Sequence, residues 1–207
     1  MTKKKTTPGP QLPVSSGNPC PFLRALVADG LLADGLNPVS KVARTIVDVA
    51  KTGEGAPALS PTQIQLVAMI AHGVSPLTVL HTQQQGVQLN GLRNGPLDKR
   101  GSGSGFLDAN AQVNLHELER LKQFASNKTS STGSTELGLS SDEITTFMDA
   151  NFKRAKHWRL VDRALMNGEW PVLLKVMGKD GPNGRYLSVA EVEALIVQRR
   201  LPERMRR

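Results

Sequence analysis

The sequence predicts a mainly α fold, a single compact helical domain of about seven to eight helices joined by long loops rich in glycine and serine. Two observations lead to this prediction. Several apolar runs with helical spacing open with an Asn-Pro or Ser-Pro pair, which is typical of a helix start. The first half of the chain holds no convincing alternation of apolar and polar residues, so strands are not expected there.

The length of 207 residues suits one domain with a substantial core. That core must be mostly aliphatic, because aromatic residues make up only 4% of the chain. We divide the chain into three parts. Residues 1–17, rich in Lys, Thr, Pro, Gly and Ser, are expected to be a flexible lead-in, residues 18–200 the helical domain, and residues 201–207 a basic tail.

Four helices are expected in the first half. The first spans residues 21–28 and stops at an Asp-Gly pair. Asn37 caps the second helix, with Pro38 at its first position. The same start signal opens the third and the fourth, at residues 60–61 and 75–76.

Helices and loops are expected to alternate in the second half. After a glycine-rich loop over residues 86–106, the apolar spacing predicts helices over about residues 115–125, 141–168, 170–178 and 189–199. Ser188 and Glu191 have the spacing of a capping box at the start of the last helix. The intervening segments 126–140 and 179–184 are expected to be a linker-like loop and a turn.

The charge of the chain disfavours one strong nucleic-acid site. The formal net charge is +8, but the basic residues form no single cluster: a lysine run at residues 3–5 begins the chain and five arginines from residue 199 onward end it. No element combines basic and aromatic side chains in the manner of a nucleic-acid motif. No apolar run is long enough for a signal peptide or a membrane span, and a single cysteine permits no intramolecular disulfide, so we expect a cytoplasmic protein.

The most informative stretch surrounds Cys20, the only cysteine of the chain. Pro19 and Pro21 flank it, and Pro21 suits the first position of a helix. Cys20 is therefore predicted to be the N-cap, with its sulfur near the free N–H groups of Phe22 and Leu23, a setting that favours the thiolate. Such a sulfur can be a haem or metal ligand, a nucleophile, a redox thiol or a cysteine that merely packs.

The order of motifs favours the haem ligand. The Pro-Cys-Pro sequence, an apolar helix, and then Asp29-Gly30 and Asp34-Gly35-Leu36-Asn37 together resemble the start of the haem-thiolate peroxidases, the family of fungal chloroperoxidase and unspecific peroxygenase. In that family the cysteine of Pro-Cys-Pro binds the iron of haem b. The resemblance implies that Cys20 is the iron ligand, with its neighbours Pro19, Pro21, Phe22 and Leu23 against the cofactor.

A second stretch resembles the segment with which the family holds a magnesium ion beside a haem propionate. Asp108 stands at the place of the aspartate and Asn110 at that of the serine, and Leu107 can offer its carbonyl. Phe106 stands where the family has a glutamate. The resemblance thus implies a Mg²⁺ or other cation bound by Leu107, Asp108 and Asn110.

The same residues allow two other interpretations. Residues 108–119 place oxygen-bearing side chains at most ligand positions of an EF-hand loop, which predicts Ca²⁺ binding, although Val113 replaces the glycine of the sharp turn. Alternatively, Asp108 or Asn114 simply caps the helix that follows.

Asp149 is the candidate catalytic acid. It lies on the predicted long helix where the family carries a distal glutamate, and a carboxylate there can take a proton from peroxide and return it. The family's partner arginine has no counterpart, because Asp142 stands in its place. The alternative is a solvent-facing charge paired with Lys153 or Arg154.

The resemblance, which covers about residues 18–170, therefore implies a haem-thiolate peroxidase or peroxygenase. Its partners would be hydrogen peroxide and a small organic substrate. The alternative function is a non-catalytic protein that binds haem, or binds Ca²⁺ at residues 108–119. Neither interpretation involves a membrane, and the sequence does not set the oligomeric state.

Overall fold

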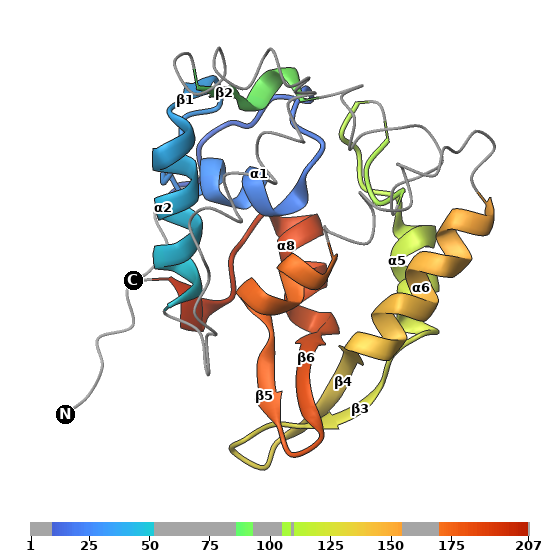
Figure 1. Cartoon of the computed structure of the whole chain (residues 1–207). Coiled ribbons are helices and arrows are strands. Elements are labelled where there is room, and N and C mark those ends of the chain that lie inside the picture. The colour runs from blue at the N-terminus through green and yellow to red at the C-terminus, as the bar shows by residue number, and fades with distance from the viewer. Residues whose placement is uncertain (1–9, 52–85, 93–104, 109, 155–169, 207) are drawn as a thin grey trace, which may run out of the picture.

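The computed structural model describes residues 10–51, 86–92, 105–108, 110–154 and 170–206 (Figure 1). Within these residues the fold is mixed α/β, about 49% helical and 18% strand. The prediction of a mainly α domain of seven to eight helices is therefore wrong. Its main error lies in the second half of the chain, where two segments expected to be a loop and a turn form a sheet. The expectation of no strands in the first half is wrong as well, because residues 36–37 pair with residues 87–88 as short strands.

The helices begin close to their predicted starts, because the start signals are local. Cys20 is the N-cap of the first helix and Pro21 its first residue, and α2 begins one residue after Pro38. Residues 170–177 are helical as well. The α-helices with both ends described are α1 (Pro21–Ala28), α2 (Val39–Ala50), α5 (Leu115–Lys122), α6 (Ser141–Arg154) and α8 (Val189–Gln198), and two 3-10 helices span Leu89–Gly91 and Glu203–Met205.

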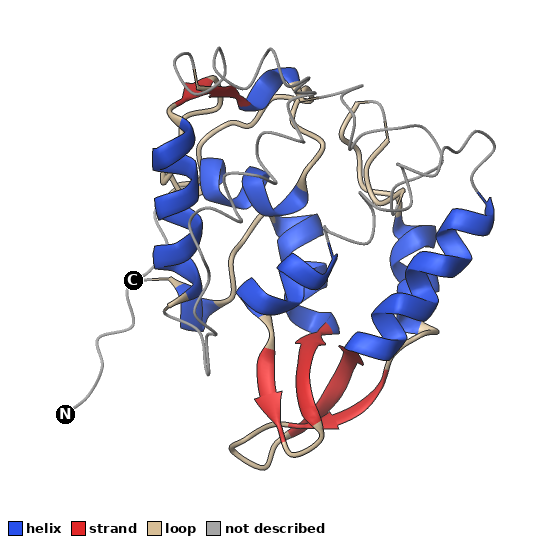
Figure 2. Ribbon diagram, viewed as in Figure 1, coloured by secondary structure: helices blue, strands red, loops and turns tan. Residues whose placement is uncertain are grey.

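Two antiparallel sheets are present (Figure 2). The smaller pairs β1 (Leu36–Asn37) with β2 (Val87–Gln88). The larger has the strand order β3-β4-β6-β5. It is built from the hairpin of β3 (Ser126–Thr129) with β4 (Thr135–Ser140) and the hairpin of β5 (Lys179–Gly181) with β6 (Gly184–Ser188). The two hairpins join through β4 and β6, which places Leu139 opposite Leu187.

The hairpins explain why the loop prediction for residues 126–140 fails. Strand β4 buries Leu139 completely, but Thr135 is the only one of its six residues with the β-branched side chain that marks strands. Gly138 allows the aromatic ring of Tyr186 to lie close to the β4 backbone, since a Cβ at Gly138 would stand only 2.5 Å from Cδ2 of that ring. The pairing thus depends on a partner that lies 48 residues later, which no local pattern reports.

The helices lie in two groups above the larger sheet. Figure 1 shows α1, α2 and α8 on one side and α5 beside α6 on the other. Helix α1 packs against α8, and α6 packs against β4. One apolar cluster joins both groups, with Leu26 of α1, Val42 of α2, Phe147 of α6 and Leu195 of α8 among its members.

The described parts of both chain ends lie against the domain. Near the first end, the side-chain Nε2 of Gln11 donates to the carbonyls of Gln198 and Arg199, each at 3.0 Å. Near the other end, Met205 is buried and Arg204 binds Glu191 through Nε, at 3.0 Å. The domain boundaries proposed from composition stay a prediction.

Several predicted segments lie outside the described residues. They are the start of the lead-in, the helices expected to open at residues 60 and 75, residues 93–104 of the glycine-rich loop, and the second half of the helix expected over 141–168. Among the helices that are described, none has the length and apolar character needed to cross a membrane.

Candidate functional site

Cys20 occupies the predicted position at the start of α1. Its backbone is extended, with φ −84° and ψ 113°, and its side chain makes no capping hydrogen bond to the helix. The residue is half-buried. Its N–H donates to Oδ1 of Asn18 at 3.1 Å, and its carbonyl accepts the N–H of Arg24 at 3.0 Å. The sulfur is therefore attached to a backbone that is fixed from both sides, at the positive end of a helix.

A buried arginine holds the segment that precedes Cys20. Arg24 is 6% exposed, and its Nη1 donates to the carbonyl of Ser15 at 2.6 Å and to that of Asn18 at 3.0 Å. The N–H of Ser15 in turn donates to both carboxylate oxygens of Asp34, each at 3.2 Å. The buried guanidinium thus fixes the turn that leads to Cys20, because a buried charge must keep its partners.

The other predicted haem neighbours divide into two kinds. Pro19, Pro21 and Leu23 are half-buried, whereas Phe22 is 8% exposed and belongs to the core cluster. A half-buried sulfur at a helix start, on a fixed backbone and with an apolar residue on each side, has the chemistry of a single axial thiolate ligand. The sulfur of Cys20 is thus the kind of donor that a haem iron takes as an axial ligand, whereas Phe22, expected beside the cofactor, packs in the core cluster together with the side chain of Cys20. No group of three or more His, Cys, Asp or Glu side chains that could hold a different metal occurs in the described part of the chain.

The loop that carries Asp108 is closed by its own hydrogen bonds. Oδ1 of Asp108 accepts the N–H groups of Asn110 and Gln112, both at 2.8 Å. Leu107 forms a bridge to Val113, and Ala111 has a φ of 59° at the turn. Asp108 therefore stabilises the loop as a turn residue rather than capping α5, whose N-cap is Asn114.

The described loop does not fit a Mg²⁺ or Ca²⁺ site. Phe106 is 3% exposed, and its ring stacks on Phe147 and meets the edge of Trp170, so the place of the second carboxylate belongs to an aromatic cluster. Helix α5 already begins at the eighth position of the proposed EF-hand loop, and Glu119, its twelfth position, binds Lys122 at 2.7 Å. No cation contributes to the function that we propose below.

Asp149 lies on α6 and is half-buried. The guanidinium of Arg154, suggested above as a partner for Asp149, binds Glu117 instead. Cys20 and Asp149 belong to elements with different main packing partners, since α1 packs against α8 and α6 against β4. The structure therefore places the acid on the expected helix, in a part of the fold whose main packing partner differs from that of α1.

The sequence analysis missed a charged cluster between α5 and α6. Glu117, whose side chain is 7% exposed, accepts two hydrogen bonds from Arg154, at 2.7 and 3.0 Å, and one from Nε of Arg120 at 2.8 Å. The guanidinium of Arg120 also covers the ring of Phe147, 4.9 Å from its centroid. The hydrogen bond from Arg154, opposed by burial and aided by Arg120, lowers the pKa of Glu117 to about 2. The only local signal was the i,i+3 spacing of Glu117 and Arg120.

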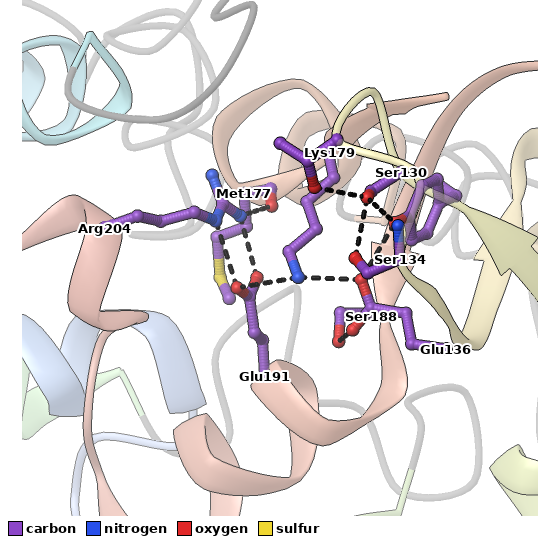
Figure 3. A network of polar contacts seen from close by, with 10 residues as sticks. Ser130, Ser134, Glu136, Met177, Lys179, Ser188, Glu191 and Arg204 are labelled. Atoms are coloured by element: carbon purple, nitrogen blue, oxygen red, sulfur yellow. Dashed lines mark hydrogen bonds and ion pairs between the residues drawn. The ribbon is translucent and has the colours of Figure 1, made fainter. Parts of the chain in front are cut away.

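A second missed network joins the sheet to α8 (Figure 3). Glu136 of β4 accepts hydrogen bonds from Lys179 at 2.7 Å, Tyr186 at 2.8 Å and Ser188 at 2.7 Å. Burial raises the pKa of Glu136, but these three hydrogen bonds outweigh burial, so the pKa lies below its usual value. Lys179 continues the network to Glu191, at 3.5 Å. With its oxygens occupied in this way, Glu136 connects β4, β5 and β6, which is a structural role.

A cavity of about 770 Å³ lies apart from the predicted site. It is enclosed by the end of α1, the end of α2 and the segment after α8, and its lining includes Leu12, Asp29, Val49, Leu201 and Arg206. None of the predicted haem, cation or acid residues lines it.

Comparisons with protein-family models, curated proteins and solved structures found nothing that matches the chain.

Proposed function

We propose that this protein is a haem-thiolate peroxidase or peroxygenase that uses hydrogen peroxide to oxidise or oxygenate small organic molecules, with haem b bound through Cys20. The observation that carries the proposal is the position of Cys20. It combines a single cysteine between two prolines, the start of a helix, and a backbone held by Asn18 and Arg24. A sulfur anion at a positive helix end, held in this way, suits an iron that must keep one ligand throughout its reactions.

Thiolate-bound haem supplies the iron on which peroxide is activated, and the thiolate favours cleavage of the O–O bond. The chain itself provides two groups. Cys20 would bind the iron through its sulfur, and the turn before α1 sets the direction of that side chain. Asp149 would take a proton from one oxygen of hydrogen peroxide and return it to the other, so that this second oxygen leaves as water. The haem would supply the transfer of the first oxygen to the substrate, so that overall hydrogen peroxide and a C–H bond would give water and an alcohol.

The proposal includes the cytoplasm as the location, since a single cysteine permits no intramolecular disulfide. Its partners are small molecules, namely peroxide and an organic substrate. No membrane or nucleic acid is required.

The test is a spectrum of the purified full chain, produced in cells supplied with a haem precursor. We expect a Soret band and, after reduction under carbon monoxide, the long-wavelength band typical of thiolate-bound haem. Cys20→Ser should remove that band, whereas Ser16→Ala, a change at an exposed neighbour, should leave it intact.

Two results would overturn the proposal. A colourless protein would exclude a haem function altogether, and an unchanged spectrum in Cys20→Ser would exclude this ligand. A protein that binds haem through Cys20 but oxidises no substrate with peroxide would instead be the non-catalytic haem protein considered from the sequence.

A further inference from the structure

Asn18 has an unused hydrogen-bond donor next to Cys20. The residue is 0% exposed, and Oδ1 of its amide accepts the N–H of Cys20 at 3.1 Å. The other end of the same amide, Nδ2, is buried and has no hydrogen-bond partner in the structure described here. Buried amide donors are nearly always paired, so an unpaired one indicates that an acceptor is still to be supplied.

The surroundings of Asn18 prevent it from turning its amide toward solvent. Its carbonyl accepts Nη1 of Arg24 at 3.0 Å, and Arg24 lies on α1, one turn after Cys20. Gly17, the preceding residue, has no room for a side chain, because a Cβ there would overlap the carbonyl of Asn90. The turn is thus fixed on both sides of Asn18, and the spare donor belongs to the same amide group that accepts the N–H of Cys20.

We propose that Asn18 is a positioning residue for Cys20 and that its Nδ2 donates a hydrogen bond to the sulfur when the sulfur binds iron. This inference rests on the proposed function. A thiolate is an acceptor, and a single asparagine that takes the N–H of Cys20 and gives a hydrogen bond to its sulfur fixes both the backbone and the side chain of the ligand. A hydrogen bond to the sulfur withdraws electron density from it and raises the reduction potential of the iron.

Arg24 acts one step further out. Its guanidinium holds the carbonyls of Ser15 and Asn18, so it sets where the amide of Asn18 lies.

The experiment compares Asn18→Ala with Asn18→Asp in the full chain. The alanine variant loses the acceptor and the donor, whereas the aspartate variant keeps an acceptor for the N–H of Cys20 and loses the donor. Asn127→Asp, at a solvent-exposed asparagine of β3, is the matched control.

Two measurements separate the two halves of the amide. In the haem-free protein, hydrogen exchange at the amide of Cys20 should speed up about tenfold or more in Asn18→Ala and stay near the native rate in Asn18→Asp. In the haem-bound protein, the charge-neutral variant Asn18→Ala should show a lower reduction potential and a higher Fe–S stretching frequency than the native chain and Asn127→Asp. Asn18→Asp serves only the exchange measurement, because its added negative charge lowers the potential by itself. A purely structural role would change the exchange rate in Asn18→Ala and leave its potential and its Fe–S stretching frequency unmoved.

The outcomes distinguish this inference from the proposed function. If haem binds through Cys20 and the potential of Asn18→Ala equals that of the native chain, the inference is overturned and the proposed function stands. If the chain binds no haem, both fall. If Asn18→Ala lowers the potential and raises the Fe–S stretching frequency, while the amide of Cys20 stays protected in Asn18→Asp, the donor of Asn18 is confirmed.

Discussion

Glu117 of α5 and Arg154, the last residue of α6, form a two-point ion pair across 37 positions of sequence, with Nη2 to Oε1 at 2.7 Å and Nη1 to Oε2 at 3.0 Å. Each nitrogen faces its own carboxylate oxygen, which is the strong geometry for arginine and a carboxylate. The pair fastens the end of α6 to α5. Because Asp149 lies within the last two turns of α6, the pair also fixes the helix segment that carries the candidate acid.

The ion pair makes the stability of the fold dependent on pH in the acid range. The pKa of Glu117 falls from 4.5 to about 2 on folding. A carboxyl whose pKa is lowered by folding stabilises the protein above its unfolded pKa, and this stabilisation is lost as the pH falls toward the folded value. We therefore expect Glu117→Gln to lower the free energy of unfolding at pH 7 by about 1–3 kcal/mol, and the difference from the native chain to shrink between about pH 5 and pH 2.

Urea unfolding at several pH values measures this difference. The control is Glu119→Gln on the same helix, where the carboxylate is 67% exposed and pairs with Lys122 at the surface. Its effect should stay within about 0.5 kcal/mol. Equal pH profiles for the native chain and Glu117→Gln would show that the pair contributes nothing to stability.

The start of α6 contains a capping box that was not predicted from the sequence. The N–H of Ser140 donates to Glu143 at 2.7 Å, and the N–H of Glu143 donates back to the hydroxyl of Ser140 at 3.4 Å. The predicted box at Ser188 and Glu191 does not form, because Ser188 donates to Glu136 and Glu191 binds Arg204. At the start of α8, hydrogen bonds to residues distant in the sequence therefore take the place of the local capping pattern.

Removal of the capping hydroxyl should destabilise α6. We expect Ser140→Ala to cost about 1 kcal/mol, since the N–H of Glu143 loses its hydroxyl acceptor and the Glu143 carboxylate loses the hydrogen bond from that hydroxyl. Ser141→Ala, one residue further and exposed, should change stability by less than about 0.5 kcal/mol. Thermal unfolding of the three proteins decides the point, and equal midpoints for the native chain and Ser140→Ala would contradict this assignment of the cap.

The close approach of β4 to Tyr186 should tolerate no side chain at Gly138. A Cβ there would lie 2.5 Å from the Tyr186 ring, 2.9 Å from Cγ of Lys128 and 3.1 Å from the carbonyl of Leu187. We expect Gly138→Ala to destabilise the protein by about 1–3 kcal/mol, because the ring or the strand must shift. Gly35→Ala is the control, since nothing lies within 4 Å of its Cβ position and its φ is not positive. If the two variants unfold at the same denaturant concentration, the close approach is not a constraint.

The contrast between helices and strands explains how much of the fold the sequence could predict. Helix α1 was predicted with both ends correct, because Pro21 at its first position and Asp29-Gly30 after its last are local signals. The β3–β4 hairpin was not predicted, because its stability comes from Tyr186 and Ser188, which bind Glu136 across 50 and 52 positions. Local propensity cannot report a contact of that range.

The candidate haem site, like the fold, could be predicted only where the signals are local in the sequence. The position of Cys20 as the N-cap of α1 follows from the two prolines, and the structure has it there. The roles of Asn18 and Arg24 do not follow, since a lone asparagine and a helical arginine give no sign of burial in the sequence. The loop at Asp108 was read as a cation site, and its closure by backbone hydrogen bonds depends on the left-handed conformation of Ala111, a residue type that rarely adopts it.

The proposed role of Asp149 gives the last prediction. If its carboxylate carries the proton between the two oxygens of peroxide, Asp149→Asn should keep the haem spectrum and lose most of the peroxide turnover, by about 100-fold or more. The amide has nearly the same size as the carboxylate but cannot accept the proton. Asp142→Asn, at an exposed acid in the first turn of the same helix, should keep full turnover.

Stopped-flow mixing with peroxide separates the proton step from haem binding. Slow peroxide consumption in Asp149→Asn together with an unchanged thiolate band places the defect at the proton transfer. Native rates in Asp149→Asn would exclude this residue as the acid and leave Cys20 as the only assigned group. Loss of the band itself would show that Asp149 supports the fold of the haem pocket rather than the chemistry, because a proton carrier need not influence which side chain binds the iron.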